Sequence, residues 1–204
     1  MEGRVVRPSR SAYAQAAEVI SRGGLVAYPT DTVYGLGCDP SNEAALRRLF
    51  EAKGRGAKPV PVLCWSRSSA ESVVDLGETG RLLANMFWPG ALTIVAPLKK
   101  ALPDLLHQGT GTLGVRVPAS EVCMGVLEGC GGILTGTSAN KSGSPPARSA
   151  DEVFREVGSS VDLIIDGGLV QGKSSTVASV AGGRVTILRT GPVRVPEELM
   201  RRRT

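Results

Sequence analysis

Four short polar clusters hold the residue types that could perform chemistry, and each one follows or interrupts an apolar stretch. The clusters read YPTDTVYGLG (28–37), AKGRGAK (52–58), TLGVRVP (112–118) and TGTSAN (135–140). Open α/β sheets bind their ligands where strands end. The sequence therefore predicts a ligand site that is assembled from these four segments.

Three cations, Lys53, Arg55 and Lys58, lie within six residues, and Gly54 and Gly56 interrupt any helix between them. Ammonium and guanidinium groups gathered in one loop suit the oxygens of a phosphate. The same cations follow a predicted helix, so they equally fit the role of solvated charges that stabilise the C-terminal end of its dipole. The residues alone leave both interpretations open.

Thr112 and Arg116 are four residues apart on a predicted strand, so their side chains lie on the same face. A buried arginine needs an anionic partner. A ligand carboxylate is slightly favoured for this role over an internal Asp or Glu. In the first and last clusters, Thr32 and Ser138 add hydroxyl groups near glycines, which suits a small polar ligand. Turns stabilised by their own side chains have the same composition, so that alternative stays open.

Groups for acid–base catalysis are scarce. His107 is the single histidine, and we expect it on the surface or in a loop, because LPDLLHQGTG arranges no catalytic serine or carboxylate around it. The chemistry expected of the four clusters is therefore the positioning and charge neutralisation of bound reactants.

Length and composition predict one domain over residues 1–204, with a core at about 10–192 and a short basic C-terminal tail. The net charge of +5 favours a polyanionic ligand such as a nucleotide or RNA. The chain shows no apolar run of membrane-spanning length and no signal-peptide pattern, which predicts a soluble, cytoplasmic protein. Distant cysteines without a CxxC pair predict free thiols and no metal site; they are Cys38, Cys64, Cys123 and Cys130.

Helical and extended patterns alternate along the chain. Helices are expected at about 11–22, 41–53, 67–74, 80–87 and 119–128, and after a capping box formed by Ser149 and Glu152. Ser11 is the expected cap of the first helix, and Gly23 and Gly24 its stop. Strands are expected at 25–29, 60–65, 92–98, 112–118, 132–137, 161–166, 175–180 and 184–189. This order predicts an α/β fold whose sheet mixes parallel and antiparallel strands.

The clusters, in this order, resemble those of the YrdC family of threonylcarbamoyl-AMP synthases. The resemblance runs from PTDTVYGLG through KGR, FWPGALT, VRVP and TSANKSG to SSTV and ILRTG, and so covers nearly the whole chain. It implies a twisted mixed sheet, flanked by helices, with a large basic cavity. It also implies that L-threonine, bicarbonate and ATP become threonylcarbamoyl-AMP and diphosphate, the first step of threonylcarbamoyladenosine formation in tRNA.

The resemblance also assigns roles to individual residues. Lys53 and Arg55 are implied as catalytic residues that stabilise phosphate charge without any general base. The implied ATP-binding residues are Arg55, Lys58, Thr112, Ser138, Asn140 and Arg189. The implied threonine-binding residues are Thr32, Arg116, Gly136 and Ser175. Mg²⁺ is expected to arrive with ATP, and the expected partners are proteins that transfer the threonylcarbamoyl group, with a possible contact to tRNA or double-stranded RNA.

Two other functions fit part of the pattern. A basic domain can bind double-stranded RNA or tRNA without catalysis, but RNA readers use aromatic platforms and aromatic residues are only 4% of this chain. A YrdC-like module also forms carbamoyl-adenylate inside hydrogenase-maturation proteins. Those proteins add acylphosphatase-like and zinc-finger parts, for which this chain has neither the length nor the cysteine spacing.

Overall fold

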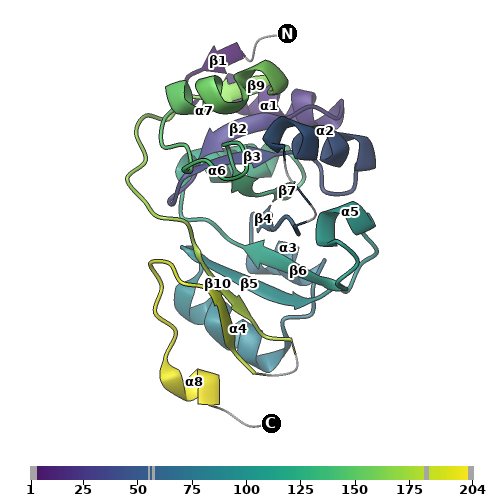
Figure 1. The fold of residues 1–204 in the computed structure, drawn as a ribbon, viewed down its shortest axis with the longest axis vertical. Helices are drawn as coiled ribbons and strands as arrows, with labels where there is room; N and C mark the ends of the chain where they lie inside the picture. The colour runs from purple at the N-terminus through teal and green to yellow at the C-terminus, as the bar shows by residue number, and fades with distance from the viewer. Residues whose placement is uncertain (1–3, 55, 57, 182–183, 202–204) are drawn as a thin grey trace.

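The computed structural model describes residues 4–54, 56, 58–181 and 184–201. Their strands form two mixed sheets (Figure 1). The first has the order β1-β9-β2-β3-β8, from β1 (Arg4–Val6), β2 (Val26–Pro29), β3 (Tyr34–Gly37), β8 (Thr137–Ser138) and β9 (Leu163–Ile165). The second has the order β11-β10-β5-β6-β4-β7, from β4 (Val62–Cys64), β5 (Leu92–Pro97), β6 (Thr112–Arg116), β7 (Ile133–Thr135), β10 (Thr176–Ser179) and β11 (Thr186–Arg189).

Each sheet contains both parallel and antiparallel pairs. In the first, β9 pairs in parallel with β1 and β2, whereas β3 is antiparallel to β2 and β8. In the second, β10 is parallel to β5 and β4 is parallel to β6, and the remaining pairs are antiparallel. The predicted mixed α/β class is confirmed, with the strands divided between two sheets.

Helices cover these sheets as Figure 1 shows. They are α1 (Arg10–Ser21), α2 (Glu43–Lys53), α3 (Arg67–Glu71), α4 (Gly77–Phe87), α5 (Asp104–His107), α6 (Glu121–Gly129), α7 (Ala150–Val157), the 3-10 turn η1 (Gly158–Ser160) and α8 (Glu197–Arg201). Helices α1 and α6 pack against each other, and α4 lies against β5. Within the described ranges, no helix has the length and apolar character that a bilayer crossing requires.

The helix caps refine two sequence predictions. The cap of α1 is Ser9, whose Oγ accepts from the Ala12 amide at 3.1 Å, and the prediction of Ser11 was wrong. Ser149 caps α7 as expected and accepts from the Glu152 amide at 3.2 Å. The Glu152 carboxylate accepts from the amide of Arg148 at 2.7 Å, one residue before the partner that a standard capping box uses.

The strand expected over 132–137 is interrupted at Gly136. Strand β7 before it belongs to the second sheet, and β8 after it belongs to the first. The Gly136 amide donates to the Pro61 carbonyl at 2.8 Å, and a Cβ at this position would lie 2.5 Å from Cγ of Leu63. The backbone therefore crosses between the sheets at a point where no side chain fits.

A buried apolar core supports both sheets. The larger cluster includes Leu46 and Leu49 from α2, Leu83 from α4 and Ile94 from β5. The four cysteines are free, as expected, and burial raises the pKa of the Cys38 thiol to about 12. The thiols contribute here as small apolar side chains.

Gly54 is the C-cap that follows α2. In its left-handed conformation (φ 53°), its backbone N–H donates to the carbonyls of Phe50 and Glu51. We predict that Gly54→Ala lowers the free energy of unfolding by about 1 kcal/mol, because a Cβ disfavours this conformation. Gly56→Ala is the matched control, since the φ of Gly56 lies outside that region and a Cβ there meets no atom within 4 Å. Urea unfolding of both variants checks this, and equal losses at the two positions would contradict it.

Candidate functional site

Both sheets contribute to the wall of a cavity of about 460 Å³. This volume lies in the usual range for small-molecule sites. The lining residues come from the turn between β2 and β3, from strands β3, β4, β5, β6, β8, β10 and β11, and from the segments that lead into β4, β6, β8 and β10. Hydroxyl side chains predominate on the described wall: Thr30, Thr32, Thr93, Thr110, Thr112, Thr137, Ser138, Ser174 and Ser175.

One end of the cavity is built around Arg116, the last residue of β6. Its side chain is only 6% exposed and reaches across to the first sheet. Nη1 donates to Thr32 Oγ1 at 2.9 Å, Nη2 pairs with the Asp31 carboxylate, and Nε donates to the Gly90 carbonyl at 2.9 Å. Three separate acceptors therefore fix the orientation of the guanidinium, while Arg116 still lines the cavity.

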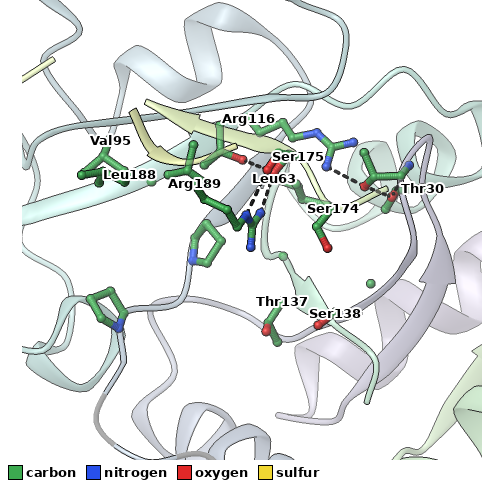
Figure 2. A pocket seen from close by; sticks show the side chains of 18 of the residues that line it. Thr30, Leu63, Val95, Arg116, Thr137, Ser138, Ser174, Ser175, Leu188 and Arg189 are labelled. Carbon is green, nitrogen blue, oxygen red and sulfur yellow. Dashed lines mark hydrogen bonds between the residues drawn. The ribbon is translucent and has the colours of Figure 1, made fainter. Parts of the chain in front are cut away.

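The middle of the cavity contains Arg189 and Ser175. Nε and Nη2 of Arg189 donate to the carbonyl and to Oγ of Ser175, both at 3.0 Å, and this Oγ lies 2.8 Å from Thr93 Oγ1. Figure 2 shows Arg189 and Ser175 between Arg116 on one side and Leu188 on the other. Burial and the charge of Arg116 lower the pKa of Arg189. An anion bound beside Arg189 would favour the charged form of this guanidinium.

The opposite end of the cavity is apolar. Val95 and Leu188 lie together there (Figure 2), and Val177, Pro59 and Pro61 also line the cavity. Leu188 is 58% exposed although it is a large apolar side chain. The cavity thus runs from a guanidinium with hydroxyls at one end to a hydrophobic surface at the other, an arrangement that suits an elongated ligand with a polar and a flat apolar part.

Lys53 is the last residue of α2 and is buried, with only 2% of its surface exposed to solvent. Its Nζ donates to the Ser138 carbonyl and, at 2.6 Å, to the Asn140 carbonyl. The side-chain Nδ2 of Asn140 donates to the carbonyls of Lys141 and Ser144. The buried Oδ1 of the same side chain has no hydrogen-bond partner among the described residues. Lys53 and Asn140 thus hold the 138–144 segment in place, and neither belongs to the described lining of the cavity.

A sequence model of one family, Sua5_yciO_yrdC, described as telomere recombination, matches residues 18–191. The chain belongs to the Sua5/YciO/YrdC family. It is similar to the threonylcarbamoyl-AMP synthase of Pyrococcus abyssi (38% identity over 185 residues, 89% of this chain and 54% of that protein). It is also similar to the threonylcarbamoyl-AMP synthase of Thiobacillus denitrificans (40% identity over 169 residues, 81% of this chain and 89% of that protein).

The fold of this Sua5/YciO/YrdC chain matches the crystal structure of P. abyssi Sua5 complexed with L-threonine. The TM-score is 0.87 at 36% identity, and the match covers 93% of this chain and 57% of that one. The chain therefore spans little more than half the length of the P. abyssi protein. The resemblance inferred from the ordered motifs is confirmed.

The structure brings together most of the residues that the family resemblance assigns to a site. Seven of them line one cavity: Thr32, Thr112, Arg116, Gly136, Ser138, Ser175 and Arg189. Lys58 is exposed next to the lining residue Pro59. Arg55 lies outside the described residues, so its place in the site stays a prediction. The large basic cavity also stays a prediction, because hydroxyls outnumber charges on the described wall.

His107 corrects one expectation. It is buried at the end of α5 rather than exposed, and its Nε2 lies 3.3 Å from Oδ1 of Asp104. Its Nδ1 has no hydrogen-bond partner among the described residues. Burial arises because α5 packs against α2, a tertiary contact that the local sequence does not contain. His107 is not among the described lining residues of the cavity.

Sequence reasoning missed several contributors to the site, and two of them bear on its polar chemistry. The partner of Arg116 is the internal Asp31, the alternative that was slightly disfavoured against a ligand carboxylate. Thr93 was overlooked because it lies within the apolar stretch of β5. Its signal was a lone hydroxyl residue in LTIVAP, which faces the cavity next to Ser175.

The Asp31–Arg116 pair is nearly buried, with side-chain exposures of 15% and 6%. A double-mutant cycle with Asp31→Ala and Arg116→Met is expected to give a coupling energy of about 2 kcal/mol in urea unfolding, because removing one partner leaves the other charge poorly solvated. The more exposed Glu71–Arg81 pair is the matched control, and its coupling should be much smaller because solvent screens the two charges. Equal coupling in the two cycles would show that the buried pair has no special role.

Proposed function

We propose that this protein is a threonylcarbamoyl-AMP synthase, which converts L-threonine, bicarbonate and ATP into threonylcarbamoyl-AMP and diphosphate. The observation that carries the proposal is the graded cavity, in which Arg116 and Thr32 lie at one end, Arg189 and Ser175 in the middle, and Leu188 at the apolar end. The Sua5/YciO/YrdC relatives named as threonylcarbamoyl-AMP synthases support it.

In this proposal threonine occupies the Arg116 end. Its carboxylate pairs with the remaining N–H groups of Arg116, with Thr32, Ser175 and Gly136 around it. ATP lies along the rest of the cavity, with its base on the apolar surface near Leu188 and its phosphates near Arg189, Ser138 and Thr112. The reacting groups of the two substrates then meet beside Ser175.

The reaction needs no strong base. The neutral amine of threonine forms a C–N bond with carbon dioxide derived from bicarbonate and loses a proton, which gives a carbamate. A carbamate oxygen then attacks the α-phosphorus of ATP, the bond to the β-phosphate oxygen breaks, and diphosphate leaves. The protein holds the reactants in line, and Arg189 stabilises the charge that grows on the phosphates. Arg55 and Lys58 are proposed to add positive charge beside the phosphates.

Lys53 is proposed to act through the segment that it holds. Because its Nζ donates to the carbonyls of Ser138 and Asn140, it fixes the position of the Ser138 side chain on the cavity wall. This differs from the direct phosphate contact that the family resemblance implies. Asn140 contributes in the same way, through its bonds to Lys141 and Ser144.

Mg²⁺ is proposed to arrive bound to the triphosphate, where it would neutralise phosphate charge. Among the residues that the structure describes, no three His, Cys, Asp or Glu side chains group to hold a metal ion. The described residues thus offer no cage for a resident ion. The product is a mixed anhydride and therefore a reactive acyl donor. We propose that a transfer protein passes its threonylcarbamoyl group to tRNA, and that both proteins work in the cytoplasm.

Incubation with L-threonine, bicarbonate, ATP and Mg²⁺ is expected to release diphosphate only when threonine is present. Arg189→Ala is expected to lower turnover by about 10²-fold, because it removes charge stabilisation beside the phosphates. Arg81→Ala, which removes an exposed arginine outside the cavity, is the control and should keep full activity. A wild-type protein that releases no threonine-dependent diphosphate but binds RNA in a salt-sensitive manner would instead be a binding module.

A further inference from the structure

The two arginines of the cavity differ in how their charge is balanced. Arg116 is paired with the Asp31 carboxylate. Arg189 donates to the carbonyl and the hydroxyl of Ser175. Among the described residues, no carboxylate oxygen lies within 4.0 Å of its guanidinium nitrogens, the limit for an ion pair. One end of the cavity is therefore formally neutral on the described residues, and its middle keeps a positive charge.

Asp31 lies behind the guanidinium rather than on the cavity wall. Its chain neighbours Thr30 and Thr32 line the cavity, whereas Asp31 is not among the described lining residues. Its Oδ1 accepts from Nη2 of Arg116, and its side chain is only 15% exposed. Asp31 therefore offsets the charge of Arg116 without presenting a carboxylate to the ligand.

This arrangement matches the charges of two different ligand classes. An α-amino acid carries an ammonium and a carboxylate at neutral pH, so its net charge is zero. A nucleotide or diphosphate is a polyanion, and an unbalanced guanidinium attracts it strongly. A guanidinium balanced by a carboxylate retains its N–H donors for hydrogen bonding but loses much of its attraction for a free anion.

We propose that Asp31 is a specificity-determining residue, which neutralises Arg116 so that this end of the cavity accepts a zwitterionic amino acid and rejects phosphates and carboxylates that lack an ammonium group. This inference rests on the proposed function, because it concerns the site assigned to threonine. It gives Asp31 a role separate from holding Arg116 in position, which Thr32 and Gly90 share.

The proximity of the two arginines gives this role its importance. Arg116 and Arg189 line the same cavity, and the charge of Arg116 contributes, after burial, to lowering the pKa of Arg189, so the two guanidinium groups act on one region. Without Asp31 they would form a doubly charged site for one polyanion. Diphosphate, the product of the proposed reaction, would then compete with threonine for Arg116.

The test uses Asp31→Asn, which keeps an oxygen to accept from Arg116 and removes the charge. Calorimetric titration with L-threonine, (R)-3-hydroxybutyrate and diphosphate compares wild type with this variant. The hydroxybutyrate is threonine without its amine, so it reports selectivity for the ammonium group. Asp162→Asn is the matched control, since Asp162 also pairs with an arginine, Arg48, at 2.9 Å, outside the cavity.

In wild type, hydroxybutyrate is expected to bind at least about tenfold more weakly than threonine. In Asp31→Asn it should bind about tenfold more tightly than in wild type, because the charge of Arg116 is no longer offset. Diphosphate should also become a competitor of threonine in this variant. Asp162→Asn should resemble wild type with all three ligands.

Other outcomes would overturn the proposal in distinct ways. Equal weakening of threonine and hydroxybutyrate in Asp31→Asn would mean that Asp31 only positions Arg116. Loss of threonine binding without a gain for hydroxybutyrate would mean that the carboxylate contacts the ammonium directly. If the variant does not fold, the titrations of the wild-type protein test the proposal. Equal affinities of wild type for threonine and hydroxybutyrate would contradict it. A wild type that binds no threonine would instead refute the proposed function.

Discussion

The buried guanidinium of Arg116 joins the two sheets of this protein. It belongs to β6 of the second sheet, and two of its three acceptors, Asp31 and Thr32, lie in the turn between β2 and β3 of the first. A buried guanidinium without acceptors is strongly unfavourable, so the sheets must lie where these contacts form. The space left between the remaining lining residues is the cavity. The interaction that orders the interior therefore also shapes the ligand site.

The rest of the wall is suited to holding reactants rather than to exchanging protons with them. Hydroxyl groups both donate and accept, so in the proposed reaction they can hydrogen-bond to a carboxylate, a carbamate and a phosphate in turn. Thr93, Ser175 and Arg189 form a connected chain in which the guanidinium polarises the Ser175 hydroxyl. Such a chain stabilises negative charge without needing a group that titrates near neutral pH, which suits a site whose described lining has no histidine.

The sequence predicted the helices and strands with strong periodicity, because their apolar spacing reports burial directly. Helix α2 is an example, with Ala45, Leu46 and Leu49 buried along one face. It did not predict the short elements β1, β3, α5 and α8, whose few residues carry little periodic signal. Nor did it predict the division into two sheets, because strand pairing across Gly136 depends on contacts distant in sequence.

For the site, most of the residues named from motif order line one cavity, but the placement of individual side chains depends on tertiary detail. The direction of the Lys53 ammonium depends on the carbonyls that it meets across 85 residues of chain. The partner of Arg116 depends on a turn from the other sheet. These are properties of the folded arrangement, and residue types at a given spacing do not determine them.

The exposed Leu188 has a thermodynamic consequence. It is 58% exposed and belongs to the apolar end of the cavity, so water covers this surface before a ligand arrives. A flat apolar group that settles on it removes that water, and such burial gives association a negative change in heat capacity. If the proposed nucleotide binds there, the enthalpy of its binding should become more favourable as the temperature rises, whereas the polar Arg116 end contributes little to this slope.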